Sequence, residues 1–326
     1  MIHRYVVAIG AGCAAALLFA VSAQTNPLAM ALAYLAPLPI MIATLGWGLG
    51  PGAAAAAISV LALTALAEPL SGLLYAASVA GPAWLLAAFA VTPIGRLVRQ
   101  SPAKAGQASV GAIVALAAAI GMAGATIVLT AVIVVYHGYS DGAKEVAAAL
   151  AKLASEAMED GVDEASARQF ADALVRVGPA AIAASTLLML CVNLYAAARS
   201  AQLSHRLPRA WADLPTSLAL PWPLALLALV SFAGALALPA PASQYFSIGA
   251  GGLGGALVLQ GLAVAHALSR GLKLRPVMLA ALYACCLLRA KYTLPVLAAL
   301  GLIDAFARLR TRAAFLPSPH PRTAQK

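Results

Sequence analysis

Residues 109–135 read SVGAIVALAAAIGMAGATIVLTAVIVV and contain no charged side chain. A helix needs about 20 consecutive apolar residues to cross the hydrocarbon core of a bilayer, which is about 30 Å thick. This stretch is long enough to cross, and it is too apolar to form the surface of a soluble domain. It therefore predicts a transmembrane helix.

Apolar runs of similar length recur on both sides of this stretch. Of the whole chain, 63% is hydrophobic and only 10% is charged, whereas soluble domains carry about 25% charged residues. We expect an all-α integral membrane protein that forms one polytopic domain over residues 1–326. The composition excludes a soluble enzyme, a secreted domain and a disordered chain. The eight expected spans are residues 5–23, 28–45, 52–67, 72–91, 109–135, 179–198, 218–238 and 246–268.

The last apolar run, residues 276–306, is interrupted by Arg289 and Lys291. The limbs on either side are about 18–21 Å long at 1.5 Å per residue, which is shorter than the hydrocarbon core. We expect a hairpin or re-entrant pair with these two residues near its turn, which brings the total to about eight to ten spans. One long tilted helix is the alternative.

Basic residues gather in short clusters between the spans, as is usual for cytoplasmic loops. Arg4 precedes the first span, and clusters follow the fourth, sixth and eighth spans: Arg96, Arg99 and Lys104, then Arg199, Arg206 and Arg209, then Arg270, Lys273 and Arg275. The clusters predict a bacterial inner-membrane protein with both termini in the cytoplasm and a basic cytoplasmic tail over residues 308–326. For the first span, a signal peptide cleaved after Val21-Ser22-Ala23 is the alternative.

The net charge of +10 does not indicate nucleic-acid binding. Eight of the eleven acidic residues lie within residues 137–177, and the basic clusters elsewhere are not interleaved with aromatic side chains that could stack on bases. Cys13, Cys191, Cys285 and Cys286 lie in apolar runs without the spacing of a zinc site or a disulfide framework. We expect no nucleic acid, metal or cofactor to bind.

Residues 137–177 form the one substantial polar segment between the spans. Apolar residues recur there at helical spacing in two runs on either side of Gly161. They are Val146, Leu150, Leu153 and Met158 in the first run, and Phe170, Leu174 and Val177 in the second. We expect two amphipathic helices over the extracytoplasmic ends of the bundle, either as a solvated cap or as a lid over a substrate entrance. Asp163 is the expected cap of the second helix.

Two pairs of glycines have the small-xxx-small spacing that lets helices approach closely: Gly48 with Gly52, and Gly251 with Gly255. The second pair overlaps a formal match to the dinucleotide fingerprint that starts at Gly249, but this motif has meaning only between a strand and a helix. We assign the four glycines to helix packing. Unwound backbone beside a ligand, as in transporters, is the alternative.

An ionisable side chain at membrane depth costs about 2.5–3.5 kcal/mol on insertion scales, so polar residues inside apolar runs are candidates for function. The candidate substrate-binding residues are Asn193, Gln260, His266, Arg289, Lys291 and Asp304. Simpler interpretations are interhelical hydrogen bonds for the uncharged residues, snorkelling for the two bases, and an ion pair of Asp304 with Arg308 one turn later. No HExxH motif, Walker lysine or catalytic pair of carboxylates is visible, so we expect no enzyme.

Four strings of residues carry a family resemblance: Tyr34-Leu-Ala-Pro-Leu-Pro-Ile40, Asn193-Leu-Tyr195 in a helix that ends at Arg199, Gln260-Gly-Leu-Ala-Val-Ala-His266, and Leu300-Gly-Leu-Ile-Asp304 followed by Arg308 and Arg310. They resemble the YybS-like predicted membrane proteins, domain-of-unknown-function family 2232. That family is similar in turn to the substrate-binding S components of energy-coupling-factor vitamin transporters. The similarity implies a six-helix substrate-binding bundle, with a separate ATPase and a membrane coupling subunit as partners.

Two functional hypotheses follow for this protein of the lipid bilayer. The first is a transport-related subunit that binds a small-molecule substrate, which requires the polar side chains at membrane depth to converge on a cavity. The second is a non-catalytic membrane scaffold or assembly factor. A scaffold would bury the same side chains in closed pairs and present its distinctive surface on residues 141–177.

Overall fold

The structure, a computed structural model, describes residues 2–24, 26–67, 69–92, 109–157, 164–207 and 213–310. Within these ranges the regular secondary structure is entirely helical. Several expected features lie outside the described residues: the basic cluster at Arg96, Arg99 and Lys104, Arg209, the helix ends at Met158 and Asp163, and the basic tail beyond residue 310.

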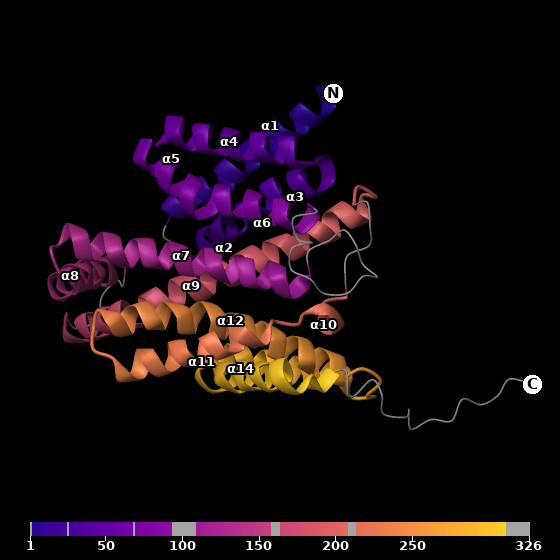
Figure 1. The fold of residues 1–326 in the computed structure, drawn as a ribbon. Coiled ribbons are helices and arrows are strands. Elements are labelled where there is room, and N and C mark those ends of the chain that lie inside the picture. The colour runs from indigo at the N-terminus through magenta and orange to yellow at the C-terminus, as the bar shows by residue number, and fades with distance from the viewer. Residues whose placement is uncertain are drawn as a thin grey trace, which may run out of the picture.

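The N-terminal third of the chain forms one layer of short and medium helices (Figure 1). Its elements are α1 (Ile2–Ala20), the 3-10 turn η1 (Val21–Ala23), α2 (Pro27–Tyr34), α3 (Pro37–Trp47), α4 (Leu49–Leu66), α5 (Pro69–Tyr75), the π-helical turn η2 (Ala76–Ala80) and α6 (Gly81–Val91). The second expected span is divided into two helices, because α2 ends before Leu35 and α3 starts at Pro37. Proline lacks the N–H that would continue the helix.

The rest of the chain adds two further layers, with α7 and α9 in the middle and α11, α12 and α14 beyond them (Figure 1). The elements are α7 (Val110–Val135), α8 (Tyr139–Ala157), α9 (Glu164–Leu203), α10 (Leu214–Ser217), α11 (Trp222–Ala237), α12 (Ala242–Leu268), α13 (Arg275–Leu288) and α14 (Ala290–Ala307). Eight helices of the described residues are long and apolar enough to cross a membrane. The prediction of an all-α polytopic membrane protein is confirmed.

The set of eight differs from the expected one at a single place. The run expected at residues 218–238 contributes only α11, which has 16 residues and starts at Trp222. Residues 218–221 ahead of it are not helical, because Pro221 disfavours the helical conformation of the residue before it. Helix α14, of 18 residues, is the eighth long apolar helix instead.

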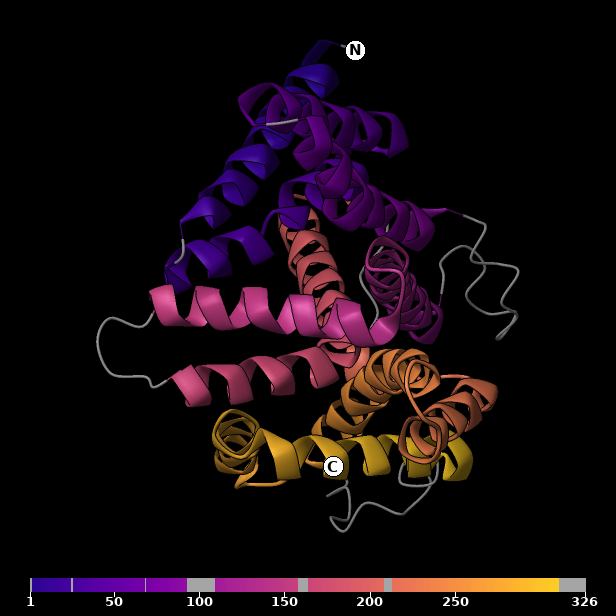
Figure 2. The ribbon, with the colours of Figure 1, turned by 90° about the vertical axis from the view of Figure 1, so that its left-hand side faces the viewer.

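Helix α9 is the central element, because it packs against α3, α7, α8 and α12. Its first part lies beside α8 across one end of the bundle, and its remainder runs through the bundle (Figure 2). The expected second cap helix and the expected sixth span are therefore one helix of 40 residues, with Pro179 inside it. A proline inside a helix removes one hydrogen bond and bends the axis without ending the helix.

The last apolar run forms two helices rather than one long one. Arg289 separates α13 from α14 with a backbone that is not helical (φ −134°, ψ 37°). The Thr293 hydroxyl donates to the Cys285 carbonyl oxygen at 3.1 Å across this break. Figure 2 shows the two helices running in different directions. Arg289 and Lys291 thus lie at the turn between two limbs, where the sequence places them.

Close contact between α12 and α14 depends on two glycines that the sequence analysis did not single out. A Cβ atom added to Gly261 would overlap the Leu297 carbonyl oxygen, and one added to Gly301 would overlap the Leu257 carbonyl oxygen. The contacts pair residue 261 with 297 and residue 257 with 301, so the residue numbers run in opposite order along the two helices. Helix α14 therefore runs against the direction of α12 where the two helices are in contact.

The four glycines assigned to packing have different surroundings. A Cβ on Gly251 would overlap the backbone of Ala180 in α9, and one on Gly255 would lie 3.0 Å from a Leu187 methyl group. A Cβ on Gly52 would overlap Thr44 of α3. Gly48 has no such neighbour; its φ of +103° makes it the turn between α3 and α4, a conformation that favours glycine.

We predict that Gly301→Ala destabilises the protein by about 1–3 kcal/mol, because the added methyl group must push α14 away from α12. The thermal unfolding midpoint in mild detergent is the measurement. Gly254→Ala is the matched control, since nothing lies within 4 Å of its added Cβ. Equal midpoints for the two variants would contradict the close helix contact.

We also predict that the two ends of the bundle lie on opposite sides of the membrane. Helix α8 and the C-terminal end of α9 lie at opposite ends of the bundle (Figure 1), and Lys144 in α8 and Ser204 just after α9 are both exposed. In a variant without the four native cysteines, Lys144→Cys should react with a membrane-impermeant maleimide in intact spheroplasts. Ser204→Cys should react only after the membrane is permeabilised. The reverse labelling pattern would show that the protein has the opposite orientation to the one that the basic clusters indicate.

Candidate functional site

A buried polar network joins α12, α14 and the non-helical segment before α11. Asp304 is 3% exposed and Gln260 is 1% exposed. The Gln260 amide Nε2 donates to Asp304 Oδ2 at 2.8 Å. Arg310 donates to the same oxygen through Nη2 at 2.7 Å and through Nε at 3.1 Å. The charge of the buried carboxylate is thus paired and hydrogen-bonded, as burial of a charge requires.

The same side chains satisfy backbone groups of α10 and of the non-helical segment that follows it. Arg310 donates through Nη1 to the Pro215 carbonyl oxygen at 2.8 Å, and through Nη2 to that of Leu218 at 2.6 Å. The Leu220 N–H donates to Gln260 Oε1 at 2.9 Å. Backbone groups away from water must find partners in the protein. The network supplies these partners where the regular hydrogen bonds of a helix are interrupted.

The expected ion pair of Asp304 with Arg308 is wrong, because Asp304 pairs with Arg310. Arg308 adopts the left-handed conformation (φ 49°, ψ 51°), and its N–H donates to the Asp304 carbonyl oxygen at 2.9 Å. This residue turns the chain back over the end of α14. This turn brings Arg310, six residues after Asp304, to the carboxylate. On a straight helix only residues three or four apart would meet, so the sequence pattern does not reveal this pair.

A second buried contact joins α9 to the break between α2 and α3. Asn193 is 1% exposed, and its Nδ2 donates to the carbonyl oxygens of Tyr34 and Met189, both at 2.8 Å. Tyr34 is the last residue of α2, so its carbonyl oxygen has lost its helical donor. The Asn193 Oδ1 atom is buried and has no hydrogen-bond partner.

The remaining candidates lie elsewhere. The His266 Nε2 atom is 2.8 Å from the Tyr283 hydroxyl, which links α12 to α13. Arg289 is exposed at the turn between α13 and α14. The ammonium group of Lys291 lies 4.9 Å from the centre of the Tyr292 ring. Among these six residues, Gln260 and Asp304 share a hydrogen bond, and His266 is the one that lines either of the two grooves described below.

An open groove of about 650 Å³ lies beside α10, and we call it the α10 groove. Helices α9, α12 and α13 form its other walls. Its polar lining consists of Tyr195, Arg199, Asp213, His266 and Tyr283. Asp213 makes an ion pair with Arg270 at 2.7 Å, and this guanidinium group holds the pKa of the Asp213 carboxyl below its usual range. The apolar lining consists of Leu214, Pro215, Leu218, Leu259, Leu262 and Ala263.

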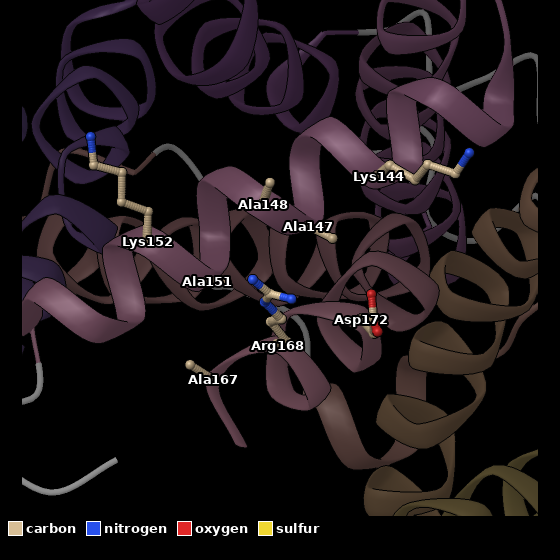
Figure 3. A pocket seen from close by; sticks show the side chains of 8 residues that line it. All are labelled: Lys144, Ala147, Ala148, Ala151, Lys152, Ala167, Arg168 and Asp172. Atoms are coloured by element: carbon tan, nitrogen blue, oxygen red, sulfur yellow. The ribbon is translucent and has the colours of Figure 1, made fainter. Parts of the chain in front are cut away.

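A second hollow of about 560 Å³ lies between α8 and the first part of α9, and we call it the cap groove. Figure 3 shows its alanine lining from both helices, with Arg168 and Asp172 extending from α9 towards α8. Lys144 and Lys152 of α8 complete the lining. Among the described residues, no group of three or more His, Cys, Asp or Glu side chains is placed to hold a metal ion.

The four strings that carry the family resemblance thus meet in two buried pairs. Asn193 contacts the string that starts at Tyr34, and Gln260 contacts the string that ends at Asp304. The family model described as "Predicted membrane protein (DUF2232)" matches residues 13–305.

The chain belongs to this family. The match covers all four strings and stops before Arg310, so one member of the buried network lies beyond it. No curated protein and no solved structure matches the chain. Family membership establishes a membrane protein, and its function has to be argued from the described residues.

We predict that Asp304→Asn and Arg310→Gln each destabilise the protein by about 3–5 kcal/mol, because each leaves a buried charge without its partner. The double variant should lose less than the sum of the two single losses. Unfolding midpoints in detergent test both statements. Asp213→Asn is the control: its ion pair with Arg270 is exposed, so the midpoint should change little. Strictly additive losses would contradict the coupling.

Proposed function

We propose that the protein is a non-catalytic membrane scaffold or assembly factor that binds another membrane or envelope protein through α8 and the first part of α9. The observation that carries the proposal is a set of large apolar side chains exposed on these two helices. Leu153 is 61% exposed, Phe170 is 55% exposed and Val177 is 60% exposed.

The faces by which the two helices contact each other carry small residues instead of these side chains. Ala167 is 3% exposed and Ala171 is fully buried. The alanines take the inward positions, whereas the large apolar residues of the two amphipathic helices are exposed. Burying a side chain such as phenylalanine or valine is worth about 1.5–3 kcal/mol. A partner that covers Phe170 and Val177 would gain that free energy.

The buried polar side chains support the scaffold over a transport subunit. A substrate site needs polar groups that face a cavity, whereas Asp304, Gln260 and Arg310 bond to one another and to the backbone. Closed pairs of this kind are what the scaffold hypothesis expects of these positions.

A photo-crosslinking amino acid at position 170 tests this proposal. We predict crosslinks to a specific protein in native membranes, and loss of these crosslinks when Val177 is replaced by serine. The same photo-crosslinker at Leu61, which is 67% exposed on the transmembrane helix α4, is the control and should react with lipid. Crosslinks from position 170 to lipid alone would show that the cap helices contact the membrane surface, which contradicts the proposal.

Transport is the second candidate, in the form of a subunit similar to the S components, with a separate ATPase and a membrane coupling subunit. The observation in its favour is the break between α2 and α3 beside Asn193, whose Oδ1 has no partner. Transporters place their binding sites at such broken helices.

The transport candidate predicts that an ATPase and a coupling subunit copurify with the protein from native membranes, together with a bound metabolite. Mass spectrometry of the purified complex is the measurement. Asn193→Ala should abolish recovery of the metabolite at a normal protein level. Ser185→Ala, on the same helix and with a hydroxyl that bonds to the Ile182 carbonyl oxygen of its own turn, is the matched control. A lower level of the Asn193→Ala protein, with no metabolite in the unaltered one, would assign Asn193 to packing.

A further inference from the structure

We infer that the α10 groove binds an anionic phospholipid, with the acyl chain on its apolar floor and the phosphate at its basic rim. The first argument is the position of the groove along the bundle. Arg199 lies one turn before the end of α9, and His266 lies two residues before the end of α12. Both helices are long enough to cross a membrane. The groove therefore lies where their apolar parts end, at the level of lipid headgroups.

The second argument is the floor of the groove. Leu259, Leu262 and Ala263 of α12 face Leu214 and Leu218 of the α10 segment across it. This surface is hydrocarbon on both sides, and an open groove of about 650 Å³ has room for part of an acyl chain. A small hydrophilic anion would leave that floor uncovered.

The third argument is the charge of the rim. The only acidic residue of the groove lining, Asp213, is already paired with Arg270. Among the described residues, Arg199 hydrogen-bonds only to the neutral Gln202, through Nη1 at 3.3 Å. Arg275 begins α13, the helix that brings Tyr283 to the groove, and among the described residues its buried Nε atom has no hydrogen-bond partner. The excess charge at the rim is therefore positive.

Tyrosines complete the fit to a lipid headgroup. Tyr195 and Tyr283 line the groove and are each 46% exposed, as is typical of aromatic residues at the membrane–water interface. Arginine makes charge-assisted, bidentate hydrogen bonds to phosphate, and basic pockets between transmembrane helices at the cytoplasmic side bind anionic headgroups. The basic clusters place this end of the bundle on that side.

The test uses the full chain in nanodiscs and native mass spectrometry of the lipids that it retains. We expect phosphatidylglycerol to be retained over phosphatidylcholine. Arg199→Gln and Arg275→Gln should each lower the apparent affinity for phosphatidylglycerol about tenfold, the loss expected for one charge-assisted hydrogen bond of about 1.5 kcal/mol. Arg289→Gln is the matched control, because Arg289 is an exposed base at the other end of α13.

Further comparisons decide the ligand class. Glycerol phosphate and inorganic phosphate should neither bind nor displace the lipid; binding as tight as that of the lipid would identify a site for free anions and overturn the inference. Equal retention of the two lipids would also overturn it, as would an equal loss in the Arg289→Gln variant. Arg199 is exposed, so its variant should unfold at the same midpoint as the unaltered protein when no lipid is added. This keeps a binding defect separate from a folding defect.

Discussion

The architecture of the C-terminal half depends on the ion pair between Arg310 and Asp304. The guanidinium group that neutralises the carboxylate also donates to two carbonyl oxygens ahead of α11. A buried ion pair by itself contributes little net stability, because desolvation offsets the attraction. Here the pair has a second role, since it lets a proline-rich, non-helical segment pass between helices where water is scarce. The close contact of α12 with α14 at Gly261 and Gly301 holds Gln260 and Asp304 within reach of each other.

The membrane class and most of the helices could be predicted from the sequence, because hydrocarbon imposes one simple requirement on every span. The interruption at Arg289 could be predicted for the same reason, since two charges divide an apolar run into limbs too short to cross. The break at Leu35 was signalled by Pro37. The composition could not show that residues 164–203 form a single helix, because Pro179 was a reasonable place for a helix to end. In the structure the helix continues past Pro179, and it packs against α7 and α12.

The candidate site was predicted less completely, and the reasons are geometric. Gln260 and Asp304 were recognised because polar groups at membrane depth need partners. Their partner Arg310 was missed, because the left-handed turn at Arg308 leaves no mark in the helical pattern. Gly261 and Gly301 were missed because they belong to different helices, and only their meeting in space gives them a role. The cap helices were recognised, but which of their faces points inward depends on alanines that a hydrophobic pattern ranks below leucine and phenylalanine.

Helix α9 connects the two surfaces to which we assign partners. Its first part carries Phe170 and Val177, and its last part carries Tyr195 and Arg199 of the α10 groove. The first part of α9 lies across one end of the bundle (Figure 2), and residues 180–203 after Pro179 extend about 36 Å at 1.5 Å per residue, which is enough to cross the hydrocarbon core. A ligand at one end that shifts this helix would change the affinity for a ligand at the other end, and linkage makes that influence mutual. Through α9, a ligand bound at one leaflet would therefore affect the binding of a partner at the other leaflet.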